Sequence, residues 1–149
     1  MSLPAVSTSQ APCFVALRQV RFSDCDPAGI VFFPNYLVML NGVVEDWWQH
    51  LGLPWTDTIG KRRMGTPVAH LDSHFLAPSS YGDTLRFELR VAALGRSSLN
   101  LEHHVLGPDA RQRLHFKQRL VCTTLDTHRS APWPDDMVQA IARFMKDST

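Results

Sequence analysis

Residues 34–51 read PNYLVMLNGVVEDWWQHL, a segment rich in large apolar side chains. Its apolar positions recur at steps of three and four residues, which predicts one long α-helix. The apolar stripe is wide, so we expect most of this helix to be buried inside the protein rather than to lie on its surface. Gly52 and Pro54 follow the segment and mark the end of the helix. The apolar positions are Tyr36, Leu37, Leu40, Val43, Val44, Trp47, Trp48 and Leu51.

Much of the remaining sequence has the pattern of β-strands. Residues 84–91, TLRFELRV, alternate polar and apolar side chains, which predicts a strand with one solvated face and one core face. Four more strands are predicted at residues 14–22, 68–76, 98–106 and 114–125. A short final helix is predicted at 134–145. One strand, one helix and then four strands indicate an α+β protein, and we expect a hotdog fold, in which a five-stranded antiparallel sheet wraps around the long buried helix.

The composition excludes several classes of protein. The 149 residues carry 15 Lys and Arg against 14 Asp and Glu, a net charge of +1, without the basic excess typical of nucleic-acid binding. The longest strongly apolar run, residues 36–40, is far shorter than the roughly 20 residues of a membrane span. The cysteines, Cys13, Cys25 and Cys122, form no C-x-x-C pair, which favours a reducing compartment. We expect a cytoplasmic protein that binds neither nucleic acid nor membrane.

The N-terminus differs in composition from the rest of the chain. Residues 1–13 are rich in Ser, Pro and Ala and lack the cationic and apolar segments of a signal peptide. We therefore expect a flexible tail over residues 1–13, followed by a single domain over residues 14–149.

Two carboxylates precede the long helix, in the turn SDCDPAG at residues 23–29. Asp24 and Asp26 lie two residues apart, so in extended backbone both side chains face the same side. Such a carboxylate can act as a base or nucleophile, and the alternative is a turn residue that bonds its own backbone. The chain then reaches the N-terminus of the helix, where free N–H groups can polarise a carbonyl oxygen. A carboxylate beside an oxyanion site is the arrangement that acyl transfer or hydrolysis needs.

The segment DCDPAGIV, residues 24–31, followed by PNY at 34–36, resembles the signature of the 4-hydroxybenzoyl-CoA thioesterase family. Further similar motifs are GLP at 52–54, GTP at 65–67 and SYGD at 80–83. The resemblance implies a hotdog fold with strand order 1-3-4-5-2, assembled as a homodimer or homotetramer with active sites between subunits. It also implies an acyl-CoA thioesterase that hydrolyses a CoA thioester, with an aryl-CoA favoured, and that needs no cofactor and no metal.

The resemblance further implies roles for individual residues. The catalytic carboxylate of the family matches Asp26, either as a nucleophile that forms a mixed anhydride or as a general base that activates water. The backbone N–H of the oxyanion position matches Phe33. Asn41 stands where enzymes that hydrolyse the 4-hydroxybenzoyl ester have a carboxylate. The resemblance therefore does not identify the acyl group of the substrate.

Other residues are assigned to substrate binding. Thr66 belongs to the second glycine motif. Arg96 matches a stretch where the family places basic residues toward the CoA phosphates, with Ser97 assisting, and an exposed turn arginine is an equal interpretation. The loop Lys61–Arg63 is interpreted as solvated, with the nucleotide 3′-phosphate as the alternative partner.

Two other functions remain as alternatives. A thioesterase for short-chain aliphatic acyl-CoA or acyl-carrier-protein thioesters would share the catalytic loop and differ in the pocket. A non-catalytic acyl-CoA-binding hotdog protein is the other. Hotdog hydratases are disfavoured, because they need a histidine near the carboxylate and none lies between Asp24 and Gln49.

Several histidines lie at positions where they could act as metal ligands. His70, Asp72 and His74 alternate along one predicted strand, so all three can face the same side. The same alternation is typical of a solvated strand face, and we expect no metal site there. His103 and His104 are neighbours on another predicted strand and must face opposite sides of the sheet.

Overall fold

The computed structural model describes residues 12–146, so the predicted tail lies outside the described residues except for Pro12 and Cys13. The helices are α1 (Pro34–His50), α2 (Trp55–Thr58) and α3 (Asp135–Lys146), with a 3₁₀ turn, η1, at Phe22–Asp24. The strands are β1 (Phe14–Gln19), β2 (Met64–Gly65), β3 (Val68–Phe75), β4 (Thr84–Leu94), β5 (Ser98–Leu106), β6 (Gln112–Val121) and β7 (Thr123–Thr124). No helix in this part of the chain is both long and apolar enough to cross a membrane.

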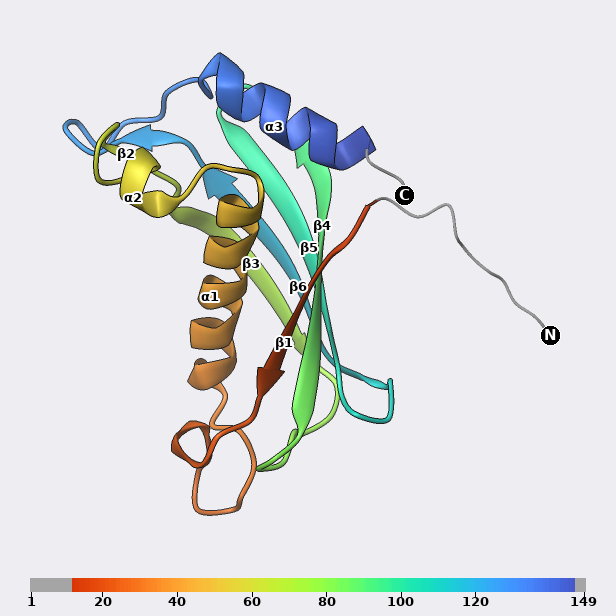
Figure 1. Cartoon of the computed structure of the whole chain (residues 1–149). Coiled ribbons are helices and arrows are strands. Elements are labelled where there is room, and N and C mark those ends of the chain that lie inside the picture. Colours follow the sequence, from red (N-terminus) through yellow and green to blue (C-terminus); the bar gives the residue numbers. More distant parts are fainter. Residues whose placement is uncertain (1–11, 147–149) are drawn as a thin grey trace.

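Five strands form one antiparallel sheet in the order β1-β4-β5-β6-β3. Numbered within the sheet, this is the expected order 1-3-4-5-2. The sheet curves along one side of α1, and α3 lies across the end of the sheet near the C-terminus of α1 (Figure 1). A separate two-stranded ladder joins β2 to β7. The predicted hotdog arrangement is confirmed.

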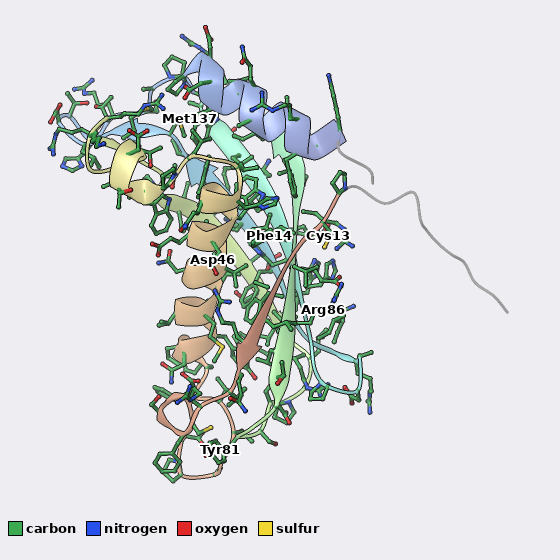
Figure 2. All side chains as sticks on the ribbon, viewed as in Figure 1. Cys13, Phe14, Asp46, Tyr81, Arg86 and Met137 are labelled. Atoms are coloured by element: carbon green, nitrogen blue, oxygen red, sulfur yellow. The ribbon has the colours of Figure 1, made fainter. Side chains whose placement is uncertain are left out.

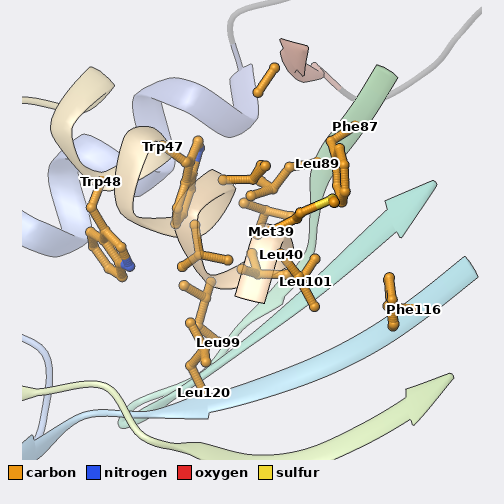
Figure 3. Close-up of a cluster of buried hydrophobic side chains, with 14 of the residues drawn as sticks. Met39, Leu40, Trp47, Trp48, Phe87, Leu89, Leu99, Leu101, Phe116 and Leu120 are labelled. Carbon is orange, nitrogen blue, oxygen red and sulfur yellow. The ribbon is translucent and has the colours of Figure 1, made fainter. Parts of the chain in front are cut away.

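The core lies between α1 and the concave face of the sheet (Figure 3). Helix α1 buries Trp47 and Trp48 completely, with exposed fractions of 0% and 1%. Full burial of a large apolar side chain stabilises the fold by about 1.5–3 kcal/mol. The buried residues that α1 contributes are Tyr36, Met39, Leu40, Val43, Val44, Trp47 and Trp48. The opposite side of the helix is exposed, including Val38, Asn41 and Glu45.

Alternation along the strands separates the two faces of the sheet. In β5, Leu99, Leu101, His103 and Val105 are buried, while the residues between them are half-buried. His103 therefore faces the core and His104 the outer face, as expected from their adjacency. The outer face is polar, because the positions between the buried ones of β4, β5 and β6 include many Arg, Lys, His and Glu side chains.

Three local features differ from the prediction. Strand β1 ends at Gln19, three residues early, because the Arg21 N–H donates to the Asp24 carboxylate and closes η1 instead. The last predicted strand breaks at Cys122, where the N–H donates to the Ser97 carbonyl and the chain turns away to pair with β2. Helix α2, directly after Pro54, is not among the helices that the sequence pattern predicts.

Candidate active site

Asp24 connects the turn to the start of α1 through hydrogen bonds. Its carboxylate accepts the Arg21 N–H at 2.8 Å. Its carbonyl accepts the Phe32 N–H at 2.9 Å and the side-chain amide of Asn35, also at 2.9 Å. These bonds give Asp24 a structural role, since they hold residues 32–35 against the turn.

The Asp26 carboxylate has one oxygen engaged and one free within the described residues. Oδ1 accepts the Ala28 N–H at 2.8 Å, and the backbone closes the turn through Gly29 N–H to the Asp26 carbonyl at 2.9 Å. Gly29 has a φ of 81°, in the left-handed region that favours glycine. Oδ1 of Asp26 therefore acts as expected of a turn residue that bonds its own backbone. Oδ2 accepts no hydrogen bond from residues 12–146.

Asp26 borders a hollow of about 460 Å³, here called the Asp26 hollow. Its other walls are Phe22, Cys25, Pro27, Gly29 and Tyr81. Figure 2 shows Tyr81 at the end of the molecule where the chain leaves β1 and enters α1, and its N–H donates to the Gly29 carbonyl at 3.1 Å. Desolvation and the two flanking carboxylates raise the pKa of the Cys25 thiol, so this cysteine is a poor nucleophile.

The backbone N–H of Phe33, directly before α1, differs from its neighbours in having no acceptor among residues 12–146. Pro34 begins α1 and has no N–H, the Phe32 amide is used by Asp24, and the Tyr36 amide donates to the Phe33 carbonyl at 3.1 Å. The Phe33 N–H donates to no acceptor in residues 12–146. It lies at the positive end of the helix dipole, which favours a developing negative charge.

The beginning of α1 is anchored in the core by Tyr36. Its hydroxyl donates to Ser79 Oγ at 2.9 Å in a buried bond. Burial raises the pKa of Tyr36, so the hydroxyl keeps its proton for this bond. The hydrogen bond holds the start of α1, and with it the Phe33 amide, against the loop between β3 and β4.

Two predicted substrate residues lie together, away from Asp26. Asn41 and Thr66 line one cavity of about 290 Å³, here called the Asn41 cavity. Arg96 and Ser97 line a smaller hollow of about 130 Å³ with Ser130, Ala131 and Pro132. Within one chain the predicted site residues other than Phe33 therefore line three separate hollows.

The predicted basic residues differ in their partners. Arg96 is exposed, and its guanidinium makes no ion pair with residues 12–146. In contrast, Arg62 forms two hydrogen bonds of 2.9 Å with Asp136, and Arg63 forms one of 2.7 Å with Asp126. The loop Lys61–Arg63 is therefore not simply solvated, because two of its three charges pair within the chain.

A buried polar pair beside the Asn41 cavity was not anticipated. His103 Nε2 lies 2.8 Å from Gln118 Oε1, and Gln118 lines the Asn41 cavity. His103 is fully buried, and its Nδ1 has no partner in the described residues. The sequence does contain a signal for this pair. Both polar residues fall at core-facing positions of the alternating strands β5 and β6, where apolar side chains are expected.

The sequence and the fold are similar to those of known proteins. The profile of the thioesterase-like superfamily matches residues 20–141. The chain is 37% identical over 90 residues to the 4-hydroxybenzoyl-CoA thioesterase of Pseudomonas sp. (strain CBS-3), covering 59% of this chain and 64% of that enzyme. It is 29% identical over 129 residues to the 1,4-dihydroxy-2-naphthoyl-CoA hydrolase of Acaryochloris marina (strain MBIC 11017), covering 85% and 94%.

A solved structure shares the fold over nearly the whole described chain. A 4-hydroxybenzoyl-CoA thioesterase mutant in complex with 4-hydroxybenzoyl-CoA matches with a TM-score of 0.81 at 27% identity, covering 88% of this chain and 99% of that one. The match to the superfamily includes β4, β5 and β6, the turn that carries Asp26 and the first part of α3. The chain is therefore a member of the thioesterase-like superfamily and has its hotdog fold.

Proposed function

We propose that this protein is an acyl-CoA thioesterase that hydrolyses an aryl-CoA thioester to the free acid and CoA. The observation that carries the proposal is a carboxylate oxygen in the turn before α1 and a backbone N–H at the start of α1, both without partners in residues 12–146. These are Asp26 Oδ2 and the Phe33 amide. Similarity to enzymes named for 4-hydroxybenzoyl-CoA and 1,4-dihydroxy-2-naphthoyl-CoA supports the aryl preference.

The proposed reaction begins at the thioester carbonyl. Asp26 Oδ2 attacks the carbonyl carbon, and the Phe33 N–H stabilises the negative charge that develops on the carbonyl oxygen. The C–S bond then breaks, which releases CoA thiolate and leaves a mixed anhydride on Asp26. Water hydrolyses the anhydride and restores the carboxylate. In the general-base version, Asp26 instead takes a proton from the water that attacks the carbonyl.

We propose that the remaining site residues bind the substrate across two subunits of a homo-oligomer. Asn41 and Thr66 contact the acyl end, while Arg96 and Ser97 contact CoA phosphate. The separation of the Asp26 hollow from the Asn41 cavity within one chain supports a site that a second copy completes. The Arg96 guanidinium, which forms no ion pair with residues 12–146, supports its assignment to phosphate.

The test is a panel of aryl, arylacetyl, short-chain and long-chain acyl-CoAs, with release of the free thiol measured for the wild type and two variants. We expect the highest kcat/KM for an aryl-CoA. Asp26→Asn should keep the fold and lower kcat by at least about 10³-fold, because the amide is nearly isosteric but far less nucleophilic and basic. Asp24→Asn is the matched control and should cost much less turnover.

Each contrary outcome has a distinct meaning. Wild-type turnover in Asp26→Asn would remove this carboxylate from the mechanism. Highest activity on short aliphatic or acyl-carrier-protein thioesters would keep the chemistry and overturn the aryl assignment. Tight binding of acyl-CoA without release of thiol would favour a binding protein.

A further inference from the structure

Three histidines form a row across the outer face of the sheet. His104 on β5 pairs with His115 on β6, which in turn pairs with His74 on β3. The rings of His104 and His115 are stacked, with centroids 4.5 Å apart and planes at 10°. The rings of His115 and His74 are also stacked, at 6.1 Å and 23°. Three imidazoles from three separate strands therefore lie side by side.

A carboxylate lies beside two of these rings. Glu102 is two residues before His104 on β5 and shares its face of the sheet. Its Oε2 accepts a hydrogen bond from His115 Nε2 at 2.8 Å and lies 3.8 Å from His104 Nε2. All three side chains are partly shielded from solvent, with exposed fractions of 35%, 26% and 22% for Glu102, His104 and His115.

A further contact determines which ring nitrogen of His104 carries the hydrogen. Its Nδ1 lies 3.2 Å from Gln112 Oε1, an oxygen that can only accept, so Nδ1 carries the hydrogen. In the neutral ring this leaves a lone pair on Nε2, the atom that faces Glu102. An outer partner that fixes the tautomer in this way accompanies most histidine ligands of metals.

We propose that Glu102, His104 and His115 bind a Zn²⁺ ion on the outer face of the sheet. Their ligand atoms already lie within 4.8 Å of one another. A tetrahedral Zn²⁺ with bonds of about 2.0–2.2 Å holds its ligand atoms roughly 3.3–3.5 Å apart, between the two carboxylate distances given above. Two imidazoles and one carboxylate suit Zn²⁺ better than Mg²⁺ or Ca²⁺, which prefer oxygen ligands.

Binding requires two small changes at the site. The near-parallel rings must rotate so that both Nε2 lone pairs meet one ion, and the terminal torsion of histidine has a broad energy profile. His115 must also change tautomer: its ring proton moves through solvent from Nε2 to Nδ1, which frees the Nε2 lone pair for the metal and keeps the imidazole neutral. The third protein ligand is the Glu102 carboxylate, whose Oε2 already lies 2.8 Å from His115 Nε2.

The site differs from the alternating histidines of β3, where the sequence leads us to expect no metal. His70, Asp72 and His74 were the alternating set, but His74 Nε2 and Asp72 Oδ1 are 3.6 Å apart with half of each side chain in solvent. The proposed site instead takes two ligands from β5 and one from β6, with His74 next in the row. It lies on the face of the sheet opposite α1, so it does not depend on the proposed thioesterase activity.

The test measures Zn²⁺ binding to the full chain, without an affinity tag, by equilibrium dialysis. We expect saturable binding of about one ion per chain. His104→Gln and His115→Gln should each weaken binding by at least about tenfold, since each removes one ligand. His128→Asn changes an exposed histidine outside the cluster and should bind like the wild type. Circular dichroism checks that every variant is folded.

Co²⁺ provides a second measurement, because its visible absorption bands reveal tetrahedral nitrogen and oxygen ligands. The bands should appear in the wild type and disappear in His104→Gln and His115→Gln. Parallel loss in His74→Gln would support the site and add a fourth ligand. No saturable binding in the wild type, or full binding in both His104→Gln and His115→Gln, would overturn the proposal.

Discussion

His103 places an ionisable ring in a core that is otherwise mostly apolar. Burial lowers its pKa from the ordinary value of 6.5 to about 4, against the opposing effect of the Gln118 hydrogen bond. The neutral ring is therefore the form that fits the fold. The unfolded chain binds a proton at His103 between pH 6.5 and pH 4, whereas the folded chain does not.

We predict that the free energy of unfolding falls as the pH is lowered from about 6.5 toward 4. A folded-state pKa below the unfolded value means that this stability is present above pH 6.5 and is lost on acidification. The contribution of His103 is on the order of 3 kcal/mol. Urea unfolding at a series of pH values measures it. In His103→Gln this part of the pH dependence should vanish, whereas His128→Asn, at an exposed site, should retain it.

Asn41 allows a prediction about substrate selection. Its amide both donates and accepts, so it should not strongly select a ring hydroxyl that must donate its proton. We expect only modest discrimination between hydroxylated and unsubstituted aryl-CoAs, well below about 10⁴-fold. Asn41→Asp should shift kcat/KM toward the 4-hydroxylated substrate. An unaltered ranking in this variant would mean that Asn41 does not contact the ring.

At the level of elements, the turn between β1 and α1 depends on the conformation of Gly29. A Cβ added there meets no atom within 4 Å, so a substitution is strained only by the positive φ of 81°. Gly29→Ala should lower the free energy of unfolding by about 1–2 kcal/mol. Gly29→Asn should lower it less, because asparagine tolerates this region. Urea unfolding compares the two, and equal losses would contradict the backbone explanation.

Helix α1 and the five main strands were predictable because their patterns are local and repeat along the chain. The period of α1 predicts which residues are buried, and the burial of Trp47 and Trp48 confirms it. The early end of β1 was not predictable from alternation, because it depends on one hydrogen bond from Arg21 to Asp24. Pairing of β7 with β2 depends on segments far apart in sequence.

The candidate site was predictable only in part. The sequence located the carboxylates and the helix N-terminus, but spacing could not separate Asp24 from Asp26, since both are turn carboxylates. Their different hydrogen-bond partners separate them. Likewise, only the folded sheet brings Glu102 next to His115, because the two residues lie on different strands.

For the molecule as a whole, exposed apolar side chains gather where β3 meets the start of α1. Phe33 contacts Phe32 and Phe75 edge to face, with centroids 5.6 and 6.2 Å apart, and all three are at least half exposed. Val38, farther along the outward side of α1, is 70% exposed. β3 is an edge strand, so one side of its backbone is unpaired. These features support the proposed homo-oligomer.

We predict that the chain elutes as a dimer or tetramer in size-exclusion chromatography with light scattering. Val38→Asp should shift the mass toward the monomer, because a charge on this surface would be buried without a partner. Leu17→Asp, at a similarly exposed apolar position on β1, is the control and should keep the wild-type mass. A monomeric wild type would contradict the prediction.

The sheet order also bears on how the chain folds during synthesis. The central strands β4, β5 and β6 are consecutive and pair as neighbours, whereas both edge strands, β1 and β3, come from the N-terminal half. Phe14 of β1 pairs with Leu89 of β4, and Val68 of β3 pairs with Leu120 of β6. Contacts between residues so distant in sequence form slowly. Since a chain leaves the ribosome N-terminus first, β1 and β3 emerge before their partner strands, and β3 can join the sheet only after β6, the last of its five strands, has been made.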